Sequence, residues 1–279
     1  MTTNPSPDIS IVIVNYNTKD YTAQCLDSLY ANPPHSSFEV IVVDNASADG
    51  SADWLEATYP QVRLVRSPRN VGIAGGNNLG IRAGSGTYVL LLNNDTIVEP
   101  GSIDELTRFL YLHPEAGGVA GQLLNPDGTF QSGYAAFPSL PQLFLITTTI
   151  GRLLDTDYPT YSTAEPSVDW PSTACMMFRR EALESVSLVD EDFFIYSDEV
   201  DLQYRLRQSG WRHYLAEAKT IHFGGETYAV ASSKKWSTEA ICFSSRSTMA
   251  CGKLIRLASY LCLCLYHKAC LLDTRLSAA

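Results

Sequence analysis

The amino-acid sequence predicts an α/β fold, with a mostly parallel, doubly wound sheet and helices on both of its faces. Short apolar runs rich in Val, Ile and Leu occupy residues 9–14, 38–43, 62–65 and 88–92, and strands buried on both faces have this composition. Stretches suited to helices lie between or after them, at 21–31, 51–58, 74–83 and 103–112. Such alternation indicates a parallel sheet, which binds ligands beyond the carboxyl ends of its strands.

The pattern is less regular after residue 117. Residues 118–137 predict a hairpin around an Asn-Pro-Asp-Gly turn, 168–178 a further buried strand, and 179–186 and 200–209 two helices. The segment 138–167, rich in Pro and Tyr, is interpreted as irregular or as short helices. A chain of 279 residues, 45% of them hydrophobic, is long enough to bury a core without disulfides or metals.

Charge is distributed unevenly along the chain. The net charge is −10, but residues 234–279 contain seven Lys or Arg and two acids, which gives +5 there and −15 in residues 1–233. An acidic body argues against nucleic acid as a partner. The seven cysteines are odd in number and form no Cys-x-x-Cys pair, and no secretory signal is recognisable. We therefore expect a cytoplasmic, reducing environment.

Polar residues directly follow three of the predicted strands. They are Asn15 and Tyr16 after the first strand, Asp44 and Asn45 after the second, and Asn93, Asn94 and Asp95 after the fourth. Asn and Asp also favour turns and helix N-caps, so each group is ambiguous by itself. Three such groups at one edge of one sheet predict a binding site.

Asp95 and a glycine-rich segment are suited to binding a diphosphate. A carboxylate at a strand end suits Mg²⁺ or Mn²⁺, which neutralises phosphate charge, although alone it could equally cap a helix. Gly75, Gly76 and Asn77 lead into a predicted helix, and a backbone without side chains can approach a negative group closely. The dinucleotide fingerprint GxGxxG and the Walker lysine pattern are both absent.

A cluster of acids precedes the predicted helix 200–209. Asp198 and Glu199 follow the aromatic stretch 193–196, and apolar surroundings raise the proton affinity of a carboxylate, which suits a general base. The alternative is a solvated helix start, where acids complement the helix dipole, and we favour it for residues 190–192. His222 is a further candidate because the glycine pair at 224–225 allows close backbone approach.

Together these motifs resemble the inverting family 2 glycosyltransferases of the GT-A fold, most closely their bacterial rhamnosyltransferase-type members. The resemblance extends from about residue 9 to residue 226. Its most specific parts are residues 70–80, the Asn-Asn-Asp-Thr quartet at 93–96, residues 168–170 with 175–180, and residues 190–211. Several specific motifs in the family's order make a chance match improbable.

The resemblance implies roles in a donor site. Tyr16 would lie against the donor base and Asp44 would accept its ring N–H, while Gly75, Gly76 and Asn77 would shape the nucleotide-sugar pocket. Asn15 and Asn45 stand beside them in the sequence and are included in the predicted donor site.

The resemblance also implies a metal site. Asp95 resembles the last acid of the family's metal-binding motif. Asn93 and Asn94 stand where many members have acids, so we expect these two at the donor. Diphosphate oxygens, alone or together with His222, would then complete the metal shell, and an imidazole ligand would favour Mn²⁺ over Mg²⁺.

The general base is implied in the same way. In the family, the base is usually the second acid of a Glu-Asp pair. Here the order is Asp198-Glu199, so Glu199 stands at the position of the base, and the choice between the two acids stays open. Trp170 and Asp201 are assigned to the acceptor, with Asp201 alternatively holding the helix. The base would remove the proton of the acceptor hydroxyl while the acceptor oxygen attacks the anomeric carbon of the donor sugar. This single displacement would invert the configuration of the anomeric carbon.

The predicted function is transfer of a sugar from a dTDP- or UDP-linked donor to a hydroxyl of a glycan or lipid-linked glycan of the cell envelope. The resemblance makes L-rhamnose from dTDP-rhamnose the first choice. One alternative is a sugar-nucleotide nucleotidyltransferase, which would need a triphosphate loop that residues 14–19 lack. The other is a catalytically inactive module that binds nucleotide sugars and needs no base.

Two parts of the chain are expected. Residues 1–233 would form the GT-A domain, with a nucleotide-binding part at about 8–124 and an acceptor and catalytic part at about 125–233. Residues 234–279 would form a basic, apolar helical tail. Three basic positions within 254–272 argue against a membrane-spanning helix. We predict an interfacial helix at the inner face of the cell membrane, the alternative being a helix packed on the body or on a second copy.

Overall fold

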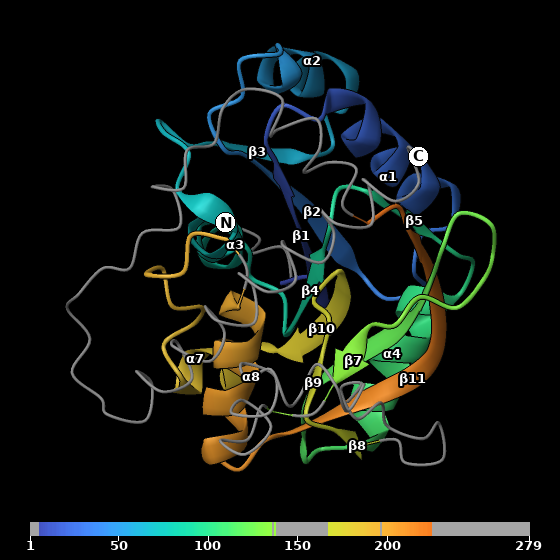
Figure 1. The fold of residues 1–279 in the computed structure, drawn as a ribbon. Helices are drawn as coiled ribbons and strands as arrows, with labels where there is room; N and C mark the ends of the chain where they lie inside the picture. Colours follow the sequence, from blue (N-terminus) through green and yellow to red (C-terminus); the bar gives the residue numbers. More distant parts are fainter. Residues whose placement is uncertain (1–5, 136, 138–166, 196, 225–279) are drawn as a thin grey trace, which may run out of the picture.

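A mixed sheet of nine strands forms the centre of the protein (Figure 1). The computed structural model describes residues 6–135, 137, 167–195 and 197–224. The first four strands are β1 (Ile9–Asn15), β2 (Phe38–Asp44), β3 (Arg63–Arg66) and β4 (Tyr88–Leu92), and they pair in parallel. This half has the architecture that the alternating apolar runs predict.

The other half of the sheet is mixed. Its strands are β5 (Thr96–Val98), β6 (Ala116–Leu124), β8 (Ser167–Val168), β10 (Cys175–Arg179) and β11 (Arg212–His222). Strand β10 lies antiparallel between β4 and β6, and β11 runs parallel to β6 and antiparallel to β5 and β8. The order along the sheet is therefore β3-β2-β1-β4-β10-β6-β11-β5, with β8 beside β11.

Helices cover both faces of the sheet, as predicted. They are α1 (Lys19–Ala31), α2 (Ser51–Thr58), α3 (Gly72–Ala83), α4 (Ser102–Leu112), α7 (Arg180–Ser185) and α8 (Asp198–Gln208). One apolar cluster joins α1, α2 and α4 to one face, and a second joins α3, α7 and α8 to the other. The result is a three-layer arrangement whose strand ends are positioned by packing on both sides.

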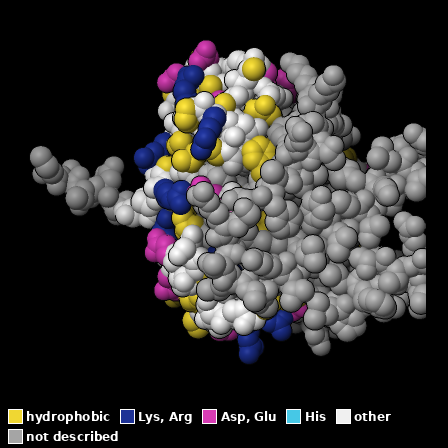
Figure 2. Space-filling model, turned by 60° about the vertical axis from the view of Figure 1, so that its left-hand side comes forward, with side chains coloured by type: hydrophobic (Ala, Val, Ile, Leu, Met, Phe, Trp, Pro, Cys, Tyr) yellow, Lys and Arg dark blue, Asp and Glu magenta, His cyan; other side chains and the backbone are white. Residues whose placement is uncertain are grey.

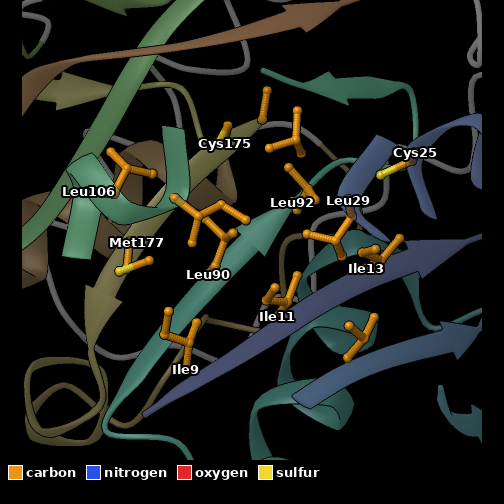
Figure 3. Close-up of a cluster of buried hydrophobic side chains, with 14 of the residues drawn as sticks. Ile9, Ile11, Ile13, Cys25, Leu29, Leu90, Leu92, Leu106, Cys175 and Met177 are labelled. Carbon is orange, nitrogen blue, oxygen red and sulfur yellow. The ribbon is translucent and has the colours of Figure 1, made fainter. Parts of the chain in front are cut away.

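Alternation along the strands explains the two clusters. Ile9, Ile11 and Ile13 of β1 point into the first cluster, where Leu90 of β4 and Leu29 of α1 also lie (Figure 3), whereas the intervening position 12 of β1 belongs to the second. Successive side chains of a strand point to opposite faces. Burial of each large aliphatic side chain stabilises the fold by about 1.5–3 kcal/mol.

The predicted hairpin at 118–137 is wrong. The turn forms, with the Gly128 N–H donating to the Asn125 carbonyl, but only a single bridge, Leu124 to Phe130, follows it back along β6. Strand β7 (Tyr134–Ala135) pairs instead with β9 (Trp170–Pro171) in a separate two-stranded sheet. Strand β10 pairs with residues 118–120 of β6 on one edge and β11 runs along the other, so a segment returning from the turn can pair only with the last residues of β6.

The single strand predicted at 168–178 is also wrong, because the structure divides it into β8, β9 and β10. The division falls around Pro171, which has no N–H to donate to a central ladder. The segment therefore leaves the large sheet after β8 and returns to it as β10.

The predicted tail, 234–279, lies outside the described residues. Within the part of the chain that the structure describes, no helix is both long and apolar enough to cross a membrane. On the face shown in Figure 2, the described Lys and Arg side chains are interspersed with apolar and acidic ones.

Candidate active site

A buried asparagine holds together the strand ends where the site was predicted. The Asn15 amide nitrogen donates to Asp44 Oδ1 (3.1 Å) and Ser47 Oγ (3.0 Å), and its oxygen accepts from the hydroxyls of Thr18 and Thr22 (3.0 and 2.9 Å). All four contacts of this fully buried amide are inside the protein. Asn15 therefore fixes the β1 and β2 ends relative to α1, and its contact with a donor stays a prediction.

Asn45 and Asn94 have similar internal bonds. Asn45 Nδ2 donates to Asn70 Oδ1 (2.9 Å) and to the Gly72 carbonyl (3.0 Å), and Asn45 Oδ1 accepts from the N–H of Val71, the N-cap residue of α3. These bonds tie the end of β2 to the start of α3. Asn94 Nδ2 donates to the Thr18 and Thr22 hydroxyls at 2.5 and 3.0 Å. Both amides lie at the strand ends where the donor site was predicted, and their contacts with a donor stay predictions.

Glycines of α3 let this helix lie close to β1. A Cβ at Gly76 would be 2.8 Å from Val14 Cγ1, and a Cβ at Gly75 would be 2.8 Å from Val71 Cγ2. The glycine at 76 thus lets α3 approach β1, whereas the glycine at 75 leaves room for Val71, the N-cap residue of α3 itself. Asn77 is buried, and Tyr16 is half-buried beyond the β1 end. The donor contacts predicted for these four residues and for Asp44 are not tested by the packing.

Asp95 and His222 lie side by side although 127 positions separate them in the sequence. Residue 222 ends β11 opposite Thr96 of β5, and this pairing brings His222 Nε2 to 3.4 Å from Asp95 Oδ1 and 3.4 Å from Asn93 Nδ2. Asp95 is only 4% exposed. The sheet thus brings together the predicted metal residues.

The geometry of this pair fits a divalent cation. His222 Nδ1 lies 2.7 Å from Gln131 Oε1, and a ring that donates from Nδ1 directs the lone pair of its Nε2 toward the carboxylate. Two ligand atoms bound to one ion at about 2.0–2.2 Å each are separated by about 3 Å. Among the described residues no group of three or more His, Cys, Asp or Glu is suited to a metal; the family resemblance assigns diphosphate oxygens to the rest of the shell.

The two acids at the start of α8 have different surroundings. Glu199 Oε2 accepts from the Thr173 N–H (2.9 Å) and hydroxyl (3.0 Å). Burial raises the pKa of Glu199, while the Thr173 bonds and the charge of His222 oppose the rise. Burial, assisted by the charge of Glu199, raises the pKa of Asp198 to about 7. The pKa of Asp198 thus lies near neutral pH, and that of Glu199 is raised by burial and held down by Thr173 and His222. Glu199 is the acid whose pKa responds to the charge of His222.

The predicted acceptor residues are arranged as follows. Trp170 lies half-buried in β9, opposite Ala135. Asp201 Oδ2 accepts from Arg205 Nε at 2.7 Å, and Arg205 Nη1 donates to the Val186 and Leu188 carbonyls. Asp201 thus orients Arg205 of the same helix, and Arg205 ties α8 to the turn after α7. An acceptor contact of either residue stays a prediction.

Sequence reasoning missed two residues of this site. Gln131 contacts His222, and Thr173 holds Glu199. Neither stands at the end of a predicted parallel strand, because Gln131 follows the turn after β6 and Thr173 precedes the antiparallel β10. The only available signal was the Asn-Pro-Asp-Gly turn, which indicates a rigid reversal before Gln131.

The chain matches the family model described as glycosyl transferase family 2 over residues 10–187. The chain belongs to this family. It is 30% identical over 237 residues to N-acetylglucosaminyl-diphospho-decaprenol L-rhamnosyltransferase of Mycobacterium tuberculosis. This match covers 77% of this chain and 75% of the relative. The match to the O-antigen biosynthesis protein RfbC of Myxococcus xanthus is 32% identical and covers 78% of this chain but 17% of that protein.

Solved structures show the same fold. The S. aureus TarS fragment 1–349 matches with a TM-score of 0.56 and 18% identity, over 80% of this chain and 63% of that fragment. GalNAc-T7, solved with UDP, GalNAc and Mn²⁺, matches with a TM-score of 0.58 and 16% identity, over 79% of this chain and 44% of that chain. The fold is therefore the predicted GT-A type. The protein is a glycosyltransferase that uses a nucleotide-sugar donor, of a rhamnosyltransferase-like type involved in polysaccharide biosynthesis.

Proposed function

We propose that this glycosyltransferase moves L-rhamnose from dTDP-rhamnose to a hydroxyl of a lipid-linked cell-envelope glycan, by a single displacement that inverts the anomeric carbon. The relative named as an L-rhamnosyltransferase acting on a decaprenol-linked sugar supports the sugar and the acceptor class. The observation that supports the chemistry most directly is the convergence of Asp95, His222 and Glu199 from three separate parts of the chain.

Glu199 is proposed as the general base in preference to Asp198. Both Thr173 bonds go to Oε2 of Glu199, which fixes the carboxylate and leaves Oε1 to accept the proton of the attacking hydroxyl. Glu199 is half-buried, whereas Asp198 is 6% exposed and accepts from the backbone N–H groups of residues 198 and 199. Glu199 is the more exposed of the two residues, which favours it for contact with an acceptor hydroxyl, and a base works best when its pKa is raised toward the operating pH.

Asp95 and His222 are proposed to hold Mn²⁺ or Mg²⁺. Such an ion would neutralise charge that develops on the departing diphosphate. The protein contributes a carboxylate and an imidazole at fixed positions, and Asn93 lies beside them without adding charge. The Mn²⁺ of GalNAc-T7 supports a metal in this fold.

Residues 234–279 are proposed to bind the membrane surface at its inner face, where a lipid-linked acceptor would be reached. Their net charge of +5 and their apolar run at 254–272 support this, because anionic headgroups attract basic segments whose apolar side chains enter the acyl boundary.

The test is transfer measured with dTDP-, UDP- and GDP-sugars, Mn²⁺ and a polyprenyl-diphosphate-linked N-acetylglucosamine. Glu199→Gln is expected to lower kcat by about 10²–10⁴-fold, because the amide cannot take the proton, with donor affinity unchanged. Glu184→Gln, an exposed change on α7, is the control and should leave kcat unaltered. Transfer by Glu199→Gln at the wild-type rate would rule out this base, and transfer from UDP-sugars alone would rule out dTDP-rhamnose.

A further inference from the structure

Gln131 occupies a position from which it can control the chemistry of His222 without reaching the reacting atoms. It lies after the turn that follows β6, and its own N–H donates to the Leu123 carbonyl, which fixes its backbone. Its side chain is directed toward the end of β11, where Oε1 meets His222 Nδ1 at 2.7 Å.

The neighbours of Gln131 determine which way its amide points. Its Nε2 donates to Asn125 Oδ1 (3.0 Å) and to the His222 carbonyl (3.2 Å). Both partners accept hydrogen bonds, so they require the amide nitrogen on that side and leave Oε1 facing the ring. Asn125 is itself fixed, because its Nδ2 donates to Thr129 Oγ1 (2.9 Å) and its N–H to the Thr129 carbonyl (2.8 Å).

An oxygen at this position determines the tautomer of the imidazole. Oε1 has no hydrogen, so Nδ1 must carry the proton and Nε2 of the neutral ring must present its lone pair toward Asp95. A metal-binding histidine needs this arrangement, and its outer partner commonly affects metal affinity about 10–100-fold.

We propose that Gln131 is a positioning residue, held by the turn 125–129, that fixes His222 in the Nδ1-protonated tautomer and so prepares Nε2 to bind the divalent cation. This inference rests on the metal site of the proposed function. It also gives a role to the Asn-Pro-Asp-Gly turn, which the catalytic site does not otherwise use.

The experiment measures Mn²⁺ binding by the change in the paramagnetic resonance signal of free Mn²⁺, with dTDP or UDP present and no transfer. Gln131→Met, of similar size but without the acceptor, should weaken Mn²⁺ binding about 10–100-fold, whereas Gln131→Glu keeps an acceptor at Nδ1 and should restore most of the affinity. Gln208→Met, at an exposed glutamine at the end of α8, should bind like the wild type.

A second measurement needs no metal. Nitrogen NMR of the histidine rings, at a pH where they are neutral, should report the Nδ1-protonated form of His222 in the wild type and a mixture of tautomers in Gln131→Met. If Gln131→Met binds Mn²⁺ with wild-type affinity and keeps the wild-type tautomer, the inference about Gln131 is overturned. Loss of Mn²⁺ binding in His222→Ala would in that case still support the proposed metal site itself. Absence of Mn²⁺ binding in the wild type would overturn both.

Discussion

Replacing Asp198 by Asn should make the protein more stable at neutral pH, and increasingly so as the pH rises. Burial and the charge of Glu199 raise the pKa of Asp198 from 3.8 to about 7. Below about pH 4 the carboxyl is protonated in the folded and the unfolded chain alike. Between that pH and 7 the unfolded chain releases the proton and the folded chain retains it, so the free energy of unfolding falls as the pH rises.

The size of the effect follows from the difference in pKa. A difference of about three pH units at about 1.4 kcal/mol each gives about 4 kcal/mol, of which about 3 kcal/mol falls between pH 5 and pH 7. Asparagine does not titrate, and its side-chain oxygen can still accept the backbone N–H groups of residues 198 and 199 that bond the aspartate. The stability difference between Asp198→Asn and the wild type should therefore grow by that amount over this interval.

Urea unfolding of both proteins at about pH 5 and about pH 7, followed by circular dichroism, measures the difference. Asp20→Asn is a matched control, because Asp20 is an exposed acid in the first turn of α1, and its effect should be the same at both pH values. The reasoning is refuted if Asp198→Asn shifts the free energy of unfolding equally at the two pH values, or if the control shows the same pH dependence.

Two further predictions concern the packing of α3 and the tail. Gly80→Ala should destabilise the protein by about 1 kcal/mol, because the new methyl meets Cγ1 of the fully buried Val12 and overpacking of about 1–3 kcal/mol exceeds the helix propensity gained. In chemical denaturation, Val12→Ala should cost less stability in the Gly80→Ala protein than in the wild type, because the added methyl fills the space that the valine leaves; additive losses would contradict this reasoning. Deletion of residues 252–279 should abolish sedimentation with vesicles of anionic lipid while transfer to a soluble acceptor analogue continues, and the proposal fails if the truncated protein still sediments.

Local patterns predicted much of the fold. The apolar runs correspond to β1, β2, β3 and β4, and the stretches between them correspond to α1, α2 and α3, because buried parallel strands and their crossover helices each have a distinct composition over short distances. Errors began where pairing depends on distant partners. The hairpin after β6 stops after a single bridge, since β10 occupies residues 118–120 of one edge and β11 runs along the other, and β10 comes from more than 50 positions further along the chain.

The candidate site shows the same division. The sequence by itself singled out the residues at the parallel strand ends, His222 beside its glycine pair and, through the family motifs, Asp95 and the acidic pair at 198–199. Only the tertiary structure decided that β11 brings His222 to Asp95, that Thr173 holds Glu199 and not Asp198, and that Gln131 faces the imidazole. The physical reason is that a strand's composition records whether it is buried, whereas the partner of each polar side chain depends on sheet register and on turns whose geometry no local pattern contains.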